Sequence, residues 1–144
     1  MSDTPITPNE VLERMLAHDK FSAWLGLKID EVGLGYCKLH YTVKEDMLNG
    51  FANIHGGVLF SASDSAFAFA CNSHGRLTVA LDVTISFLRR TEVGETLTVE
   101  AKEMYIGNKT GVYDIRTTNE QGELVAFFKG TAYRTMKEIE RLQR

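Results

Sequence analysis

The chain has 144 residues, of which 44% are hydrophobic and 24% are charged, which is enough for one compact domain with a buried core. Its formal net charge of −3 does not suggest the basic surface that nucleic-acid binding requires, so we expect no nucleic-acid partner. The N-terminus lacks the positive start and apolar run of an export signal. Cys37 and Cys71 show neither disulfide-framework nor metal-ligand spacing. These features exclude a secreted disulfide-rich protein and predict a cytoplasmic one with reduced thiols.

The N-terminal segment, residues 1–26, is predicted to be helical. Thr7 suits the N-cap position, Pro8 suits the first helical position, and Glu10 completes a capping box. An apolar stripe then continues to a helix end that we predict near Lys20.

Two extended runs follow, at residues 27–32 and 36–43. In the second run apolar and polar side chains alternate, which is typical of a half-buried antiparallel strand. Residues 55–75, HGGVLFSASDSAFAFACNSHG, are apolar on almost every side, so the helix predicted there lies inside its domain. Because Asp64 near its centre would be costly in lipid, we expect a buried helix and no membrane span.

After this helix the apolar pattern changes to a period of two residues. It predicts four strands and then a frayed helical tail, at residues 77–88, 96–106, 110–118, 123–135 and 136–144. Two strands, one buried helix and four more strands indicate a single α+β domain over residues 1–144. Its mostly antiparallel sheet of about six strands would curl around one long central helix. Since such a sheet leaves edge strands exposed, we expect a homodimer.

The segment MLNGFANIHGGVLFSASDSAFAFACNSHG resembles the phenylacetate-degradation thioesterases of the hotdog-fold superfamily. The family pattern has LNG, a short gap, HGG and then an aspartate about eight residues later. Similarity in TISFLR, GNKTGVYDI and VAFFKGTAYR extends the resemblance from about Leu48 to Arg134. The resemblance implies a hotdog fold, an acyl-CoA substrate, no cofactor beyond the coenzyme A of that substrate, and a homo-oligomer, either a dimer or a homotetramer of two dimers.

Gly56 and Gly57 lie where the loop becomes the helix. The first backbone N–H groups of a helix have no internal partners and carry the positive end of the macrodipole, so they can polarise a carbonyl as an oxyanion site. A glycine also lets a ligand approach the backbone closely. The alternative is a tight turn, whose positive φ angles would by themselves select glycine.

Asp64 is an ionisable residue inside an apolar helix, a costly position that suggests a function. It is predicted to act as a general base or as a nucleophile toward a thioester carbonyl, and the sequence leaves both routes open. The alternative is an aspartate that only accepts hydrogen bonds from loop amides or from Ser63 or Ser65. Eight residues separate Asp64 from Gly56, which is about 12 Å along a helix. We therefore expect one site to take its carboxylate and its oxyanion donor from two subunits, as the resemblance also implies.

Three further residues belong to the predicted catalytic group. His55 is predicted either to orient the carboxyl group or substrate, or to cap the helix. The resemblance implies that Asn49 positions the reacting centre, although an ordinary Asn-Gly turn is by itself the simpler explanation. At Ser65, where relatives commonly carry threonine, the hydroxyl is predicted to hold the attacking water; the alternative is helix packing. We predict no metal site, because the cysteines and histidines lack zinc-ligand spacing.

A coenzyme A substrate requires cations for its phosphates and a groove for its pantetheine arm. The predicted binding residues are Gly57, Phe60, Arg89, Arg90, Lys109 and Thr110, with Phe67 and Met47 as further walls of the pocket. Arg90 departs from the family, in which many relatives carry proline at that position. For each basic residue the alternative is a solvated surface charge.

The predicted function is hydrolysis of an acyl-CoA thioester to free acid and coenzyme A. The resemblance implies an aryl-acetyl group such as hydroxyphenylacetyl, and medium-chain acyl groups stay open. One alternative is a non-catalytic acyl-CoA sensor on the same fold, but no basic helix-turn-helix segment precedes Phe21. Another is an acyl-CoA hydratase, whose chemistry requires a His paired with Asp or Glu and fits the glycine-supported layout less well.

Overall fold

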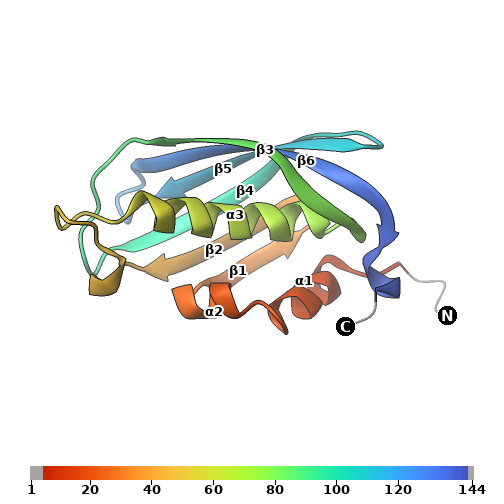
Figure 1. The fold of residues 1–144 in the computed structure, drawn as a ribbon, viewed down its shortest axis with the longest axis horizontal. Helices are drawn as coiled ribbons and strands as arrows, with labels where there is room; N and C mark the ends of the chain where they lie inside the picture. Colours follow the sequence, from red (N-terminus) through yellow and green to blue (C-terminus); the bar gives the residue numbers. More distant parts are fainter. Residues whose placement is uncertain (1–4, 143–144) are drawn as a thin grey trace.

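The computed structural model describes residues 5–142. Six strands form one antiparallel sheet in the order β1-β2-β4-β5-β6-β3, and this sheet curls around helix α3 (Gly56–Asn72) (Figure 1). This is the hotdog arrangement, and it confirms the predicted α+β fold. Within the described residues, no helix is long and apolar enough to span a membrane.

The strand bounds follow the period-two pattern of the sequence closely. The strands are β1 (Lys28–Gly33), β2 (Tyr36–Thr42), β3 (Arg76–Phe87), β4 (Thr96–Ile106), β5 (Thr110–Thr118) and β6 (Leu124–Glu138). β4 and β5 begin and end at the predicted residues. The alternation is clear in both because one face packs on the core and the other is more exposed, as their burial patterns show.

Small side chains let α3 pack close to the concave face of the sheet. Ala62, Ala66 and Ala70 are fully buried and recur every four residues, so they form one stripe along the helix. Phe67 lies beside this stripe, with its ring centroid 5.5 Å from that of Tyr113 and 5.8 Å from that of Phe128. The remaining sheet residues of this core include Leu39, Val99, Ala101, Ile115 and Ala132.

Two helices occupy the N-terminal segment, where the sequence predicted one. α1 (Pro8–Leu16) begins with the predicted capping box. α2 (Lys20–Leu25) has its own N-cap, Asp19, whose carboxylate accepts a hydrogen bond from the Ser22 N–H at 3.0 Å. It ends at Gly26, which has a φ angle of 75°. The predicted helix end near Lys20 was wrong: α1 ends at Leu16, and Asp19 then starts a second helix that the sequence did not predict.

β3 forms one edge of the sheet and, among the described residues, pairs only with β6. It carries apolar side chains that remain largely exposed, with relative exposures of 47% for Val79, 61% for Leu81 and 55% for Phe87. An unpaired strand edge with an apolar surface is the feature on which the predicted homodimer depends.

The two ends of α3 have different surroundings (Figure 1). Loop 48–55 and the end of β3 lie at its N-terminal end, whereas the β4–β5 hairpin and the end of β6 lie at its C-terminal end. β6 continues past the predicted end, and the Ile139 N–H donates to the Gly75 carbonyl at 2.8 Å. A short 3₁₀ helix, η2 (Ile139–Arg141), follows in place of the predicted helical tail, of which residues 143–144 lie outside the described residues.

Candidate active site

The loop before α3 is fixed by Asn49. A 3₁₀ helix, η1 (Glu45–Met47), leads into the loop, and the Asn49 N–H donates to the Asn53 carbonyl at 2.8 Å. The side-chain oxygen of Asn49 accepts from the backbone N–H groups of Phe51 at 2.9 Å and Asn53 at 3.2 Å. The turn explanation therefore accounts for this oxygen. Within residues 5–142 the Asn49 side-chain NH₂ donates no hydrogen bond, and the residue lines the pocket described below.

His55 is the N-cap of α3. Its Nδ1 accepts a hydrogen bond from the Gly57 N–H at 2.8 Å, so the neutral ring carries its proton on Nε2. The His55 N–H in turn donates to the Met47 carbonyl at 2.8 Å. The capping role that the sequence left open is therefore present, and it occupies the Gly57 amide, which cannot also bind an oxyanion.

The Gly56 N–H is the amide that the cap leaves free. Gly56 is half-buried, and no acceptor for its N–H is found within residues 5–142. Neither Gly56 nor Gly57 has a positive φ angle, so the tight-turn explanation for these glycines is wrong. A Cβ at Gly56 would lie 3.1 Å from Cζ of Phe87, which shows how closely a neighbouring group approaches this backbone. Glycine is therefore used here for close approach and a free donor.

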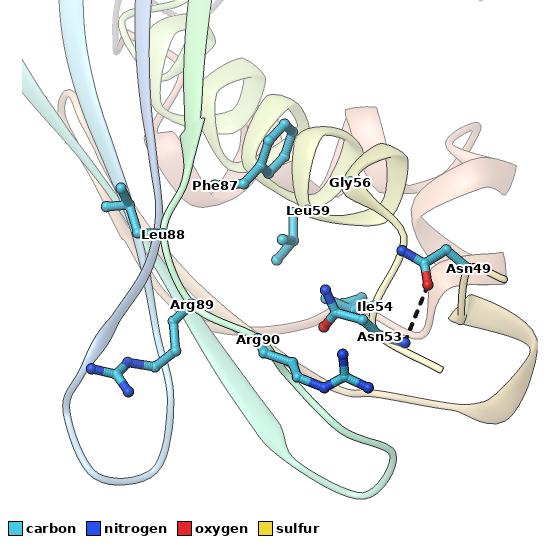
Figure 2. A pocket seen from close by; sticks show the side chains of 9 residues that line it. All are labelled: Asn49, Asn53, Ile54, Gly56, Leu59, Phe87, Leu88, Arg89 and Arg90. Atoms are coloured by element: carbon cyan, nitrogen blue, oxygen red, sulfur yellow. Dashed lines mark hydrogen bonds between the residues drawn. The ribbon is translucent and has the colours of Figure 1, made fainter. Parts of the chain in front are cut away.

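A pocket of about 420 Å³ opens in front of this amide (Figure 2). Its lining residues are Asn49, Asn53, Ile54, Gly56, Leu59, Phe87, Leu88, Arg89 and Arg90. Figure 2 shows the two arginines extending from the segment that follows β3, across the pocket from Asn49.

Two of the predicted cations therefore lie at the pocket, and both already have partners. Arg89 forms an ion pair with Glu123 at 3.0 Å, and Arg90 donates to the carbonyls of Phe51 at 2.9 Å and Ala52 at 3.5 Å. Sequence reasoning missed Asn53, whose side-chain oxygen accepts from the Thr91 N–H at 2.9 Å and ties the loop to the segment after β3. The sequence offered no signal for that contact, which joins residues 38 positions apart.

Asp64 lies at mid-helix and is not among the pocket-lining residues. Its side chain is half-buried and makes no hydrogen bond within the described part of the chain, so the alternative that it merely bonds loop amides or neighbouring serines is wrong. Burial raises the pKa of the Asp64 carboxyl above its ordinary value. Within one chain, the Asp64 carboxylate therefore lies apart from the free N–H of Gly56.

Ser65 contacts the N-terminal helices. Its Oγ lies 3.0 Å from the Oγ of Ser22 in α2, and the Ser22 hydroxyl donates to the Asp19 carboxylate at 2.6 Å. Ser22 is buried, with 2% exposure. Sequence reasoning did not anticipate this connection, which joins residues 43 positions apart.

Several predicted binding residues lie away from the pocket. Phe60 is half-buried, and its ring packs edge-on against Phe128 with centroids 5.4 Å apart. Phe67 and Met47 are not walls of the pocket that contains Gly56, because both are buried in the core, with 1% and 5% exposure.

Lys109 and Thr110 lie in the β4–β5 hairpin, at the other end of the sheet. Along β6, Ala126 pairs with Phe87 and Tyr133 pairs with Thr110. The seven residue steps from Ala126 to Tyr133 span on the order of 23 Å at about 3.3 Å per residue. Within one chain, Lys109 and Thr110 therefore do not reach the pocket that holds Arg89 and Arg90.

The chain is similar to several known proteins over most of its length. Residues 51–126 match the thioesterase superfamily. The chain is 44% identical over 120 residues to acyl-coenzyme A thioesterase PaaI of Escherichia coli strain K12. This match covers 83% of this chain and 86% of that protein. The structure of the E. coli PaaI protein from the phenylacetic acid degradation operon matches with a TM-score of 0.89 and 40% identity, over 91% of this chain and 95% of that one. A hypothetical thioesterase from Streptococcus pneumoniae, solved with coenzyme A, matches with a TM-score of 0.75 and 27% identity, over 78% and 88% of the two chains.

The curled sheet, the central helix and these matches together show that the chain belongs to the thioesterase superfamily, as a hotdog-fold thioesterase of the PaaI type.

Proposed function

We propose that the protein hydrolyses acyl-CoA thioesters to the free acid and coenzyme A. The observation that carries this proposal is the free N–H of Gly56 at the start of α3, which opens onto a pocket edged by two arginines. A backbone donor held in place at a helix N-terminus is suited to the negative charge that develops on a thioester oxygen.

In the proposed reaction, water attacks the thioester carbon while Asp64 takes one proton from that water. The Gly56 N–H stabilises the resulting negative charge on the former carbonyl oxygen. Collapse of the tetrahedral intermediate breaks the carbon–sulfur bond, and the proton held by Asp64 passes to the leaving thiolate. The products are the carboxylic acid and the thiol of coenzyme A, and Asp64 returns to its carboxylate form.

The surroundings of Asp64 favour the general-base route. Burial raises its pKa, and no hydrogen bond within residues 5–142 stabilises its charge, so it is a stronger base than an exposed aspartate. The nucleophilic route would instead place an acyl group on Asp64. Intact-protein mass spectrometry of a reaction quenched in acid tests this point: we expect no acylated chain, and an acyl adduct would assign the nucleophilic route.

We also propose that each site uses two copies of the chain. Gly56 and Asp64 lie about 12 Å apart along α3, while the apolar edge of β3 is open for pairing. In a homodimer joined along β3, a two-fold axis reverses the second copy, so the far end of one sheet comes next to the pocket of the other. That arrangement would supply Asp64, and also Lys109 and Thr110, to the partner's pocket.

For the substrate we propose an aryl-acetyl-CoA such as hydroxyphenylacetyl-CoA. The E. coli relative comes from the phenylacetic acid degradation operon. The Phe87 ring lies against Gly56 and supplies an aromatic wall for such a group. Arg89 and Arg90 are exposed and have five N–H donors each, so their present partners leave donors for the coenzyme A phosphates.

A matched pair of variants tests the oxyanion donor. Gly56→Pro removes this N–H at the first helical position, where proline is favoured, and the preceding residue His55 already has the extended backbone that proline requires, with φ −66° and ψ 135°. Gly56→Ala places a Cβ in the same position but keeps the N–H. In an assay of free-thiol release, we expect kcat of Gly56→Pro to be about 10²–10³-fold below that of Gly56→Ala. Equal rates for the two variants would contradict the proposed function.

A second pair tests the base. Asp64→Asn should lower kcat by about 10²–10⁴-fold. Asp114→Asn, on the face of β5 turned away from α3, should leave the rate unchanged. A near wild-type rate in Asp64→Asn would reject the assignment of the carboxylate. Acyl-CoA binding by the wild-type protein without any thiol release would indicate a sensor.

Coexpression tests the shared site. Gly56→Pro and Asp64→Asn are each expected to have a strongly reduced rate, but a mixed dimer of the two contains one site with both native residues. Partial recovery of turnover in the mixed oligomer is the expected result. No recovery in an oligomer shown to contain both chains would mean that each chain builds its site alone.

A further inference from the structure

We propose that Asp19 and Ser22 are positioning residues, which turn the hydroxyl hydrogen of Ser65 toward α2 so that the Ser65 oxygen accepts a hydrogen bond from the attacking water. This inference rests on the proposed hydrolysis and adds two residues from a part of the chain outside the family's HGG-to-aspartate segment.

The three side chains form a continuous hydrogen-bonded chain. The Asp19 Oδ2 and the Ser22 Oγ are 2.6 Å apart, and the Ser22 Oγ and the Ser65 Oγ are 3.0 Å apart. Ser22 is buried and Ser65 is half-buried, so bulk water competes little for the middle of the chain. Asp19 is held in turn by its second oxygen, which accepts the Ser22 N–H at 3.0 Å.

The direction of the chain follows from counting hydrogens. An ionised carboxylate has only acceptors, and a serine hydroxyl has one hydrogen to donate. The 2.6 Å contact is in the range of a charge-assisted O–H···O⁻ bond, so the single hydroxyl hydrogen of Ser22 is directed to Asp19. The contact between the two serines must then use the hydrogen of Ser65. The Ser65 oxygen retains acceptor capacity and has no hydrogen left to give.

This direction suits a water held next to Asp64. Asp64 and Ser65 are consecutive in α3, about 100° apart around the helix axis, and both are half-buried. A water that donates one hydrogen to the Asp64 carboxylate and the other to the Ser65 oxygen keeps a lone pair free for the thioester carbon. If Ser65 donated to the water instead, it would occupy one of the two lone pairs of the water oxygen and draw electron density from it, which would weaken the nucleophile.

Ser61 provides a matched control within the same helix. It lies one turn before Ser65, and its hydroxyl donates to the Gly57 carbonyl at 2.7 Å. Ser61 therefore loses a similar hydrogen bond when it is changed to alanine, but it has no connection to Asp19.

The test is a set of four variants, Asp19→Asn, Ser22→Ala, the double variant and Ser61→Ala. Asp19→Asn keeps an oxygen for the Ser22 N–H and so preserves the cap of α2, but its NH₂ group donates to the Ser22 hydroxyl and reverses the chain. We expect Asp19→Asn and Ser22→Ala each to lower kcat by roughly five- to tenfold, with KM and melting temperature close to those of the wild type for Asp19→Asn. Ser61→Ala should match the wild-type kcat. In the double variant, Asp19→Asn should add no further loss, because Ser22 no longer transmits its effect.

The outcomes separate this inference from the proposed function. Wild-type kcat in Asp19→Asn and Ser22→Ala, together with a large loss in Gly56→Pro, would overturn the positioning role and leave the hydrolysis intact. A loss in Asp19→Asn that persists unchanged when Ser22 is alanine would also overturn it, since the effect would then bypass the chain. Full activity in Gly56→Pro and Asp64→Asn would instead reject the proposed function.

Discussion

The N-cap that His55 provides for α3 should contribute measurably to the stability of the fold. His55 is exposed, so its replacement by alanine removes little packing, and the main loss is the bond between Nδ1 and the Gly57 N–H at 2.8 Å. Removing an N-cap acceptor costs about 1 kcal/mol, within a range of about 0.5–2 kcal/mol. For a domain of this size about 1 kcal/mol corresponds to roughly 2–5 °C in melting temperature. We expect a fall of that size for His55→Ala, measured by thermal unfolding followed by circular dichroism.

His55→Asn is the control, because the asparagine oxygen is a favoured N-cap acceptor. His55→Asn should restore the melting temperature. If His55→Ala lowers kcat and His55→Asn restores it, the role of His55 is to hold the helix start. If kcat stays low in His55→Asn, the ring also orients the substrate. An unchanged melting temperature in His55→Ala, at the same protein concentration and oligomeric state, would refute the capping magnitude.

Three further predictions concern burial and pH. Because the folded-state pKa of Asp64 is raised, its ionisation opposes folding as pH rises above its ordinary value of 3.8, so Asp64→Asn should melt above the wild type at neutral pH and lose this advantage in acid. The hydrogen bond from Tyr36 at 2.6 Å is the main cause that lowers the pKa of Glu100, so it stabilises the fold above the ordinary pKa of a glutamate and this contribution is lost as pH falls through the lowered value. Tyr36→Phe should therefore reduce the urea midpoint at neutral pH and change it little in strong acid; an equal reduction at both pH values would contradict this. In Gly130→Ala the new Cβ would lie 2.7–2.9 Å from three ring carbons of the buried Phe67, so we expect destabilisation of about 1–3 kcal/mol in urea unfolding, partly relieved by adding Phe67→Leu.

The strands and the central helix were accessible from sequence because each has a regular apolar pattern set by one buried face. β4 and β5 show this best, since every second residue packs on the core over the first half of β4 and over most of β5. The end of α1 was misplaced and α2 was missed because both sides of Asp19 have helix-forming residues, and the cap depends on where the chain turns. The extension of β6 to Glu138 was missed because it depends on tertiary contacts such as the bond from Ile139 to Gly75.

The candidate site divides in the same way. Gly56 and Asp64 were identifiable because both are unusual at their positions. Gly56 leaves the helix start without a side chain, and Asp64 places a charge inside an apolar helix. The link from Ser22 to Ser65 and the support from Asn53 to Thr91 were not identifiable, because they join residues far apart in the sequence. The location of Lys109 and Thr110 depends on the register of β5 against β6, which alternation does not determine.

The bond from Arg90 to the Phe51 carbonyl braces the loop that carries the family's LNG and HGG residues. This side-chain tether joins residues 39 positions apart in the sequence. A loop that these contacts already hold before substrate binds would need little rearrangement during the reaction. A rigid donor of this kind would bind a tetrahedral oxyanion better than a planar thioester, which favours turnover over tight retention of substrate.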